Sequence, residues 1–149
     1  MAKVEAPDVN EEAAVLAGRL RPVLQRLHRH LRRQNQAMGT SPLHIGLLNS
    51  ISQQEGLGIG ELALQEKLRG PTITAHINQM ETEGWVERRP SPKDGRRVGL
   101  FITRKGRGLM AAAQQRRADW LAMRLAELSP EGRRAVTAAL APLEALCHE

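Results

Sequence analysis

Residues 69–106 read RGPTITAHINQMETEGWVERRPSPKDGRRVGLFITRKG, and this stretch decides the fold. Pro71 suits the first position of a helix, because its missing N–H would have no partner there and its φ angle is already helical. Apolar residues then recur with helical spacing and predict one buried stripe, formed by Ile73, Ile77 and Met80. Gly84 is typical of the left-handed residue that ends a helix. The sequence therefore predicts a helix over residues 71–83.

A β-hairpin is expected directly after this helix. One extended run begins at Trp85, and a second covers Val98 to Thr103. Proline and serine residues interrupt the chain between the two runs, and Asp94-Gly95 is a typical turn signal. A helix followed at once by a hairpin favours a recognition helix with a wing.

The outward face of the predicted helix is polar but uncharged, which is unusual for a solvated face. It consists of Thr72, Ala75, Asn78, Gln79 and Thr82. Short side chains of this kind suit a helix that contacts base edges in the major groove of DNA, where Asn and Gln can pair with adenine and methyl groups can contact thymine. We expect base contacts from Arg69, Thr72, Thr74, Ala75, Asn78 and Gln79. His76 lies near the buried stripe, so packing is favoured over base contact.

Positive charge is concentrated in the predicted hairpin. The whole chain carries 22 basic and 16 acidic residues, a net charge of +6. Residues 86–107 alone hold eight basic and two acidic residues, which is also +6. The remainder is neutral on balance, so the charge pattern points to a polyanionic partner at the hairpin.

The same stretch resembles the MarR family of winged helix-turn-helix regulators. Residues 94–106, DGRRVGLFITRKG, are similar to the family's D-x-R … L-T-x-x-G wing motif, with Ile102 in place of the usual Leu. Residues 80–86, METEGWV, resemble its L-E-x-x-G-h-V motif, and Glu61-Leu62-Ala63 with residues 71–74 resemble its helix-turn-helix. The resemblance extends over nearly the whole chain. It departs at Glu66, where the family usually has an apolar residue, and at Ala75, where many relatives have Arg.

The resemblance implies a mainly α-helical fold with a small β-hairpin wing. We expect a single domain over residues 1–149, in which residues 41–103 form the DNA-binding lobe and residues 10–36 and 104–149 form a helical dimerisation region. In the wing, a basic tip can enter a narrow minor groove. The expected DNA-binding residues there are Arg88, Lys93, Asp94, Arg96 and Arg97. By resemblance, Asp94 orients Arg96 or another arginine through a charge-assisted pair.

Cap residues and apolar periodicity predict a helix that opens at Thr40-Ser41-Pro42 and runs to about Gln54, a short helix over residues 61–68, and three longer helices outside the DNA-binding lobe. A first helix runs from about Asn10 to Arg33, and Pro22 should either kink it or restart it. A long helix runs from Thr103 to about Leu128, and a last one starts at Ser129-Pro130 and should be kinked by Pro142. Their apolar positions predict a homodimer core: Leu16, Leu20, Leu121, Leu125, Val136, Leu140 and Leu143. An intrachain three-helix bundle is the alternative. The arginines between residues 19 and 33 form either a solvated face or a second contact with DNA or an acidic partner.

Several classes of function are disfavoured by composition. Aromatic residues make up 2% of the chain, which argues against a single-strand binder with stacked bases. Cys147 is the lone cysteine, and no histidine or cysteine spacing predicts a metal site or a cofactor. No catalytic constellation is evident, so the chain is not expected to be an enzyme. No apolar run is long enough to span a bilayer and no signal-peptide pattern is present, so we expect a cytoplasmic protein.

The expected function is sequence-specific binding of double-stranded DNA at a pseudo-palindromic operator by a homodimer. The family resemblance implies repression that is relieved by a small aromatic or anionic ligand, and the expected neighbourhood of its pocket is Leu24, Leu27, His28, His44 and Trp120. Two alternatives stay open. One is a sequence-neutral architectural DNA-binding protein, and the other is a ligand-binding helical dimer that has lost its DNA function.

Overall fold

The computed structural model describes residues 10–36 and 39–148. The expectation that the N-terminus has no signal-peptide pattern concerns residues that lie largely outside these ranges. Six helices and two strands follow in the order α1 (Glu11–Gln36), α2 (Pro42–Gln53), α3 (Ile59–Gln65), α4 (Gly70–Thr82), β1 (Val86–Pro90), β2 (Val98–Ile102), α5 (Arg104–Ala126) and α6 (Pro130–Ala145). The mainly α-helical fold with a hairpin wing, expected from the sequence, is confirmed.

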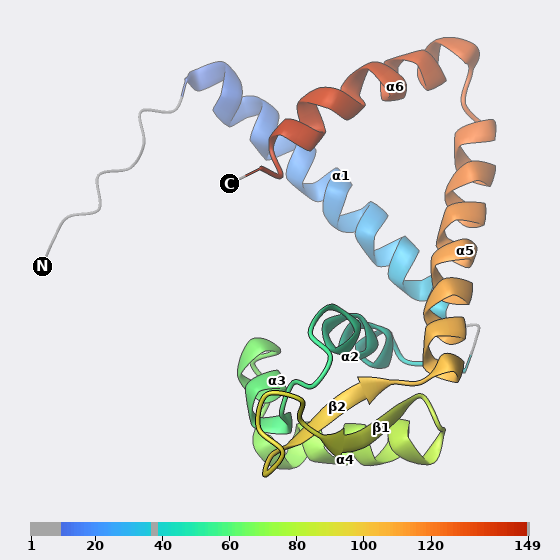
Figure 1. Ribbon diagram of the computed structural model, residues 1–149. Coiled ribbons are helices and arrows are strands. Elements are labelled where there is room, and N and C mark those ends of the chain that lie inside the picture. The colour runs from blue at the N-terminus through green and yellow to red at the C-terminus, as the bar shows by residue number, and fades with distance from the viewer. Residues whose placement is uncertain (1–9, 37–38, 149) are drawn as a thin grey trace, which may run out of the picture.

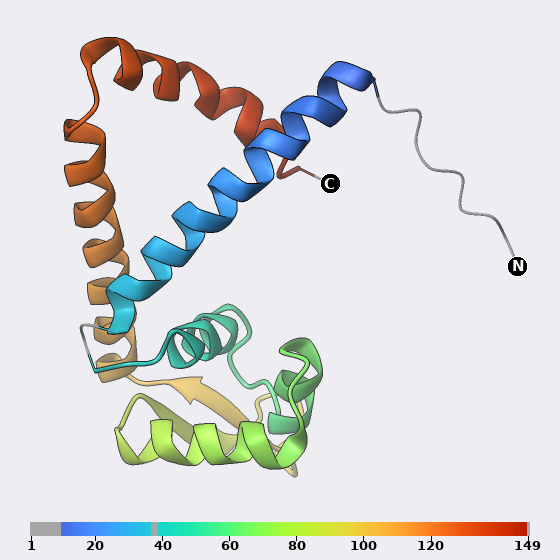
Figure 2. The same cartoon turned by 180° about the vertical axis from the view of Figure 1, so that it is seen from behind.

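Two parts are visible in the ribbon (Figures 1 and 2). Residues 42–102 form a globular lobe, which contains α2, α3, α4 and the β1–β2 hairpin. Helices α1 and α5 rise from this lobe and diverge, and α6 turns back from the far end of α5 toward α1. We call α1, α5 and α6 the arms.

The core lies almost entirely in the lobe. Apart from Ala113 of α5, the buried hydrophobic residues of the described chain all belong to residues 42–102. The largest fully buried side chains include Leu47, Leu48, Ile51, Leu62, Ile73, Ile77, Met80 and Leu100. The stripe predicted for α4 is therefore confirmed, because all three of its members are completely buried.

Local signals in the sequence explain where the elements begin and end. Ser41, Thr103 and Ser129 occupy N-cap positions, and each side-chain oxygen accepts a hydrogen bond from a backbone N–H of the following helix. Gly84 has a φ angle of +75°, and the N–H groups of Gly84 and Trp85 donate to the carbonyls of Glu81 and Met80. These two bonds form the left-handed end of α4 that glycine permits.

The predicted first helix of the helix-turn-helix differs in its bounds. Residues 61–68 were the expected range, but α3 ends at Gln65 and Lys67 adopts a φ angle of +53°. Glu66 lies at this turn, half-buried, and its carboxylate accepts a hydrogen bond from the Ser50 hydroxyl of α2. A partner in α2 explains why a carboxylate is tolerated here, since a buried polar group requires a hydrogen bond.

Proline did not end the arm helices. Pro22 lies inside α1, which is a single helix of 26 residues, and Pro142 lies inside α6. A restart of the first helix at Pro22 is therefore wrong.

The intrachain three-helix bundle is also disfavoured, because no residue of α6 is fully buried and Leu140 is 52% exposed.

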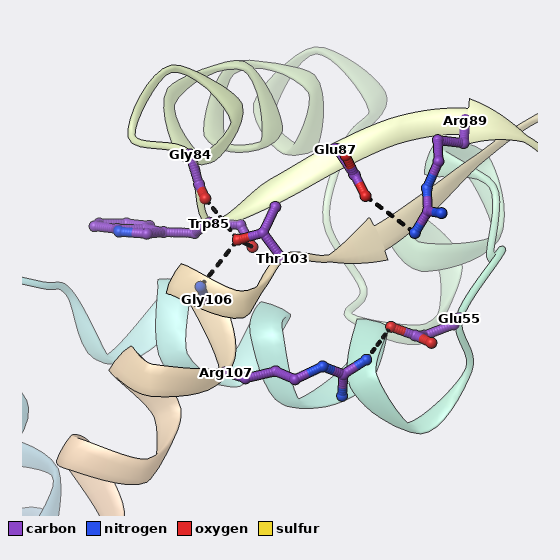
Figure 3. Close-up of polar contacts among 8 residues, drawn as sticks. All are labelled: Glu55, Gly84, Trp85, Glu87, Arg89, Thr103, Gly106 and Arg107. Carbon is purple, nitrogen blue, oxygen red and sulfur yellow. Dashed lines mark hydrogen bonds and ion pairs between the residues drawn. The ribbon is translucent and has the colours of Figure 1, made fainter.

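A tight junction joins the wing to α5 (Figure 3). The Thr103 hydroxyl donates to the carbonyl oxygen of Gly84 (2.6 Å) and accepts from the N–H of Gly106 (3.0 Å). A Cβ atom on Gly106 would lie 2.2 Å from the carbonyl oxygen of Trp85, so only glycine allows this approach. The first turn of α5 is thereby fixed against the end of α4 and the start of β1.

Candidate nucleic-acid interface

Helix α4 presents its predicted outward face to solvent. Its expected base-contacting residues are all exposed: Arg69, Thr72, Thr74, Ala75, Asn78 and Gln79. Two threonine hydroxyls are already engaged, because Thr74 donates to the carbonyl of Gly70 (2.8 Å) and Thr82 donates to that of Asn78 (3.0 Å). Each threonine therefore offers its methyl group and oxygen lone pairs to a partner.

The opposite edge of α4 is fixed to α2 by a pair of histidines. His44 Nε2 and His76 Nδ1 lie 3.1 Å apart, so one ring donates a hydrogen bond to the other. The rings meet edge to face, and the Trp85 ring lies 5.8 Å from that of His44. His76 therefore packs inside the lobe, as its place near the apolar stripe suggested. Burial lowers the pKa of His44, the neighbouring His76 lowers it further, and Glu83 opposes both effects.

Most basic residues of the hairpin and of the first turn of α5 fall into two groups. Those nearest the lobe contact their own chain: Arg88 pairs with Glu81, Arg89 with Glu87 (3.0 Å), and Arg107 with Glu55 (2.6 Å; Figure 3). Arg89 also lies over the Phe101 ring, 4.3 Å from its centroid. Lys105 donates to the carbonyl oxygen of Glu83 (2.7 Å). These cations help to hold the hairpin in place.

The second group lies at the tip of the wing. Lys93, Arg96 and Arg97 are exposed, and within residues 10–36 and 39–148 none of the three forms an ion pair. The tip itself is ordered by backbone bonds, since the Arg97 N–H donates to the Asp94 carbonyl (2.9 Å) and the Ser91 N–H donates to the Arg97 carbonyl (2.7 Å). A hydrogen-bonded turn thus presents three cations to solvent.

Asp94 does not form the expected charge-assisted pair with an arginine side chain. Its carboxylate accepts a hydrogen bond from the backbone N–H of Arg96 at 3.0 Å, and no arginine side chain in the described chain pairs with it. This bond is a typical Asx turn. Asp94 therefore shapes the backbone that carries Arg96, and the charge-assisted pair predicted from the resemblance is absent from the described residues.

The five residues expected near a ligand pocket are not brought together. His28 lines a cavity of about 390 Å³ between α1, α2 and α5, together with Arg32, Asn35, Leu43, Met110 and Arg117. His44 lines a different cavity beside α4, and Trp120 stacks on His30. Leu24 and Leu27 are exposed on α1 and line neither cavity. A sequence pattern could not separate these cavities, because both arise from the spacing between helices.

Sequence reasoning missed the partner of Arg88. Its guanidinium lies between α4 and β1, where it contacts the Glu81 carboxylate and donates from Nη2 to Asn78 Oδ1 at 2.8 Å. Glu81 lies on α4 and Arg88 on β1, so no periodicity within a single element relates them, and no sequence pattern could have predicted this contact. Within the described residues, no cluster of three or more His, Cys, Asp or Glu residues could hold a metal ion. No helix there is both long and apolar enough to cross a membrane.

Comparison with known proteins gives a consistent result. Residues 41–98 match the MarR family. An uncharacterized HTH-type transcriptional regulator from Mycobacterium bovis is 34% identical over 136 residues, which cover 91% of this chain and 95% of that protein. The multiple antibiotic-resistance repressor (MarR) from Listeria monocytogenes superimposes with a TM-score of 0.75 at 14% identity, covering 97% of this chain and 100% of the other.

A third similar structure contains a nucleic acid. The F27L mutant of MepR from Staphylococcus aureus, bound to an oligodeoxyribonucleotide, superimposes with a TM-score of 0.65 at 18% identity. The overlap covers 89% of this chain and 98% of that protein. At this identity the likeness concerns the fold.

Proposed function

The chain belongs to the MarR family and is a transcriptional regulator of that family, and from this premise we propose that it is a homodimeric repressor that binds a specific sequence of double-stranded DNA. In each protomer α4 enters a major groove, and the tip formed by Lys93, Arg96 and Arg97 enters the adjacent minor groove. The observation that carries the proposal is the exposed, uncharged face of α4 beside a hydrogen-bonded tip with three exposed cations.

The wing tip and α4 have the two separate roles that DNA recognition requires, affinity and discrimination between base pairs. Cations that contact phosphates and the minor groove supply affinity and its salt dependence. Uncharged side chains on α4 supply discrimination between base pairs, because the major groove presents a different donor and acceptor pattern for each pair. Ala75 makes no polar contact, so base selection rests on its neighbours Thr72, Asn78 and Gln79.

Dimerisation through the arms supports the same proposal. Apolar side chains on α1 and α6 remain exposed in the single chain, with Leu16 at 61% and Leu140 at 52%. The proposed interface contains Leu16, Leu20, Leu121, Leu125, Val136, Leu140 and Leu143. A two-fold dimer positions two α4 helices on one face of the duplex, so the operator is pseudo-palindromic with half-sites about 10 bp apart.

The cavity between α1, α2 and α5 is the proposed ligand site. Its volume of about 390 Å³ suits a small organic molecule. Arg32 and Arg117 line it together with one carboxylate, Glu66, and with apolar contacts from Leu43 and Met110. The excess of positive charge beside apolar surface favours a small aromatic or anionic compound. Because the cavity lies where the arms meet the lobe, a ligand that prefers one spacing of the lobes shifts the population away from the DNA-binding state.

Replacement of Arg96 by Ala tests the DNA-binding proposal. Affinity for a selected operator should fall at least tenfold, and the slope of log K against log salt should decrease by about one released ion per protomer. Arg134→Ala is the matched control, because it removes the same charge from α6, at the opposite end of the molecule (Figure 1). An unchanged slope for Arg96→Ala would contradict the role of the wing.

Selection of bound sequences from random duplex DNA separates the alternatives. A recovered pseudo-palindrome supports a specific regulator, whereas uniform protection of genomic fragments in footprinting supports a sequence-neutral architectural protein. Absence of binding to any duplex supports a helical ligand-binding dimer. Repeating the selection with phenolic and anionic compounds tests relief by a ligand.

A further inference from the structure

A side chain of the wing strand holds a side chain of the recognition surface. Arg88 of β1 donates from Nη2 to Oδ1 of Asn78 on α4 at 2.8 Å, and its Nη1 contacts the Glu81 carboxylate. Asn78 and Glu81 are three residues apart on one helix, so their side chains are neighbours. One guanidinium therefore bridges both residues. Its side chain is 27% exposed and that of Glu81 is 39% exposed, so the bridge lies at the edge of the lobe.

The chemistry of arginine fixes which way the Asn78 amide points. A guanidinium has only N–H donors and no acceptor. The atom of Asn78 that faces it must therefore be the oxygen Oδ1, since the alternative would oppose two donors. The amide nitrogen Nδ2 then points away from Arg88 and remains on the exposed face of α4.

This orientation conflicts with the usual way in which Asn recognises adenine. That pairing uses both amide atoms, because Oδ1 accepts from N6 of adenine while Nδ2 donates to N7. Arg88 occupies one of the two lone pairs of Oδ1 and holds that oxygen against β1, so Nδ2, with its two N–H donors, is the group of Asn78 that faces outward. Guanine presents two adjacent acceptors, N7 and O6, on its major-groove edge. Adenine presents N7 beside a donor, so its N6 amino group would oppose the Asn78 amide.

We propose that Arg88 is a positioning residue that converts Asn78 into a hydrogen-bond donor, so that this position of α4 selects guanine over adenine. The inference rests on the proposed binding of α4 in a major groove. It assigns Arg88, expected from the sequence to contact DNA in the wing, to the recognition helix instead. It also replaces the expected pairing of Asn78 with adenine by a pairing with guanine.

Selection from a random duplex pool, followed by affinity measurements on single-base variants of the selected site, tests this inference. Asn78→Ala first identifies the base pair that Asn78 contacts, as the one position where preference is lost. At that position the wild-type protein should bind guanine about tenfold more tightly than adenine. Arg88→Met, which keeps the length of the side chain but removes its donors, should abolish this preference by freeing the amide to rotate.

Arg89→Met is the matched control. It removes one arginine from the next position of the same strand, where the side chain contacts Glu87 and the Phe101 ring and not Asn78. Its guanine preference at the identified position should equal that of the wild type. In the free protein, the side-chain amide resonances of Asn78 should shift in Arg88→Met and remain in place in Arg89→Met, which reports the contact without DNA.

Asn78→Asp gives a second test that leaves the core untouched. Both carboxylate oxygens are acceptors, so Arg88 keeps its partner while the donor is lost. Guanine preference should disappear, and cytosine, which offers its N4 amino group, should be favoured at the same position. Circular dichroism of each variant verifies the fold.

The possible outcomes are distinct. Wild-type preference for adenine at the position that Asn78 contacts would overturn this inference and leave the proposed function intact. An unchanged guanine preference in Arg88→Met, with the fold retained, would overturn the positioning role. Failure of the wild-type protein to bind any duplex would overturn the proposed function and this inference with it.

Discussion

The lobe and the arms differ in where their apolar side chains lie. In the lobe, α2, α4 and β2 bury Leu48, Ile77 and Leu100 completely within one chain. In the arms, Leu16 and Leu140 remain more than half exposed, and α6 buries no residue fully. A helix with a persistent apolar face requires a surface to cover it. The lobe therefore covers its apolar side chains within one chain, whereas the arms leave an apolar face uncovered, which is the basis of the proposed dimer.

The largest expected effect comes from a cavity in the lobe. Leu48→Ala should lower the free energy of unfolding by about 2–5 kcal/mol, because the removed methyl groups leave a void in a closed core. Leu64→Ala is the control, since Leu64 lies in the same lobe but is 82% exposed, and its effect should stay within about 0.5 kcal/mol. Urea denaturation measures both. Equal effects would show that the lobe lacks a specific core.

The junction between the lobe and α5 should respond to a single methyl group. Gly106→Ala should destabilise the protein by about 1–3 kcal/mol, because its Cβ would overlap the carbonyl oxygen of Trp85. Gly108→Ala, two residues later in the same helix, meets open space and should stabilise it by about 0.5–1 kcal/mol. Thermal unfolding measures whether each variant is more or less stable than the wild-type protein. A stabilising Gly106→Ala would contradict the close approach.

A charge on an arm should weaken dimerisation. Leu140→Glu should raise the dissociation constant of the dimer at least tenfold, about 1.4 kcal/mol, because a carboxylate would be buried in the proposed interface. Leu64→Glu adds the same charge to the lobe and should leave the dimer intact. Sedimentation velocity over a range of concentrations provides the measurement. A monomeric wild-type protein would contradict the proposed role of the arms.

The smallest effect concerns pH in the lobe. The pKa of His44 is lower in the folded protein than its ordinary value, so the unfolded chain binds a proton more readily. Stability should therefore be highest above pH 6.5 and should decrease as the pH falls from 6.5 toward the pKa of His44 in the folded protein. His44→Gln should reduce this dependence, whereas His148→Gln, at the exposed end of the chain, should not. Denaturation midpoints between pH 5 and 8 test the prediction.

The same comparison explains what the sequence could predict. Signals carried by adjacent residues were sufficient for the caps at Ser41, Thr103 and Ser129 and for the left-handed Gly84. Periodicity identified the buried face of α4. These features depend on local geometry, which a short stretch of residues determines.

Features that depend on the spacing between elements were missed. The Asn78–Arg88 contact joins a helix to a strand, and the His44–His76 pair joins two helices. The residues expected in one ligand pocket lie around different cavities for the same reason. At Asp94 the competing interaction was local: a carboxylate two residues before a free backbone N–H forms an Asx turn more readily than it reaches a guanidinium.

Because Gly106 packs against Trp85, a small tilt of α5 at its first turn displaces the far end of the helix by a larger distance. A helix of 23 residues is about 35 Å long, so a tilt of about 10° moves its remote end by roughly 6 Å. Since the first turn of α5 is clamped to the end of α4 and the start of β1, the same tilt must swing the wing and α4 as one rigid piece. The junction has no room for even one extra carbon atom at Gly106, so the first turn of α5 cannot move closer to Trp85.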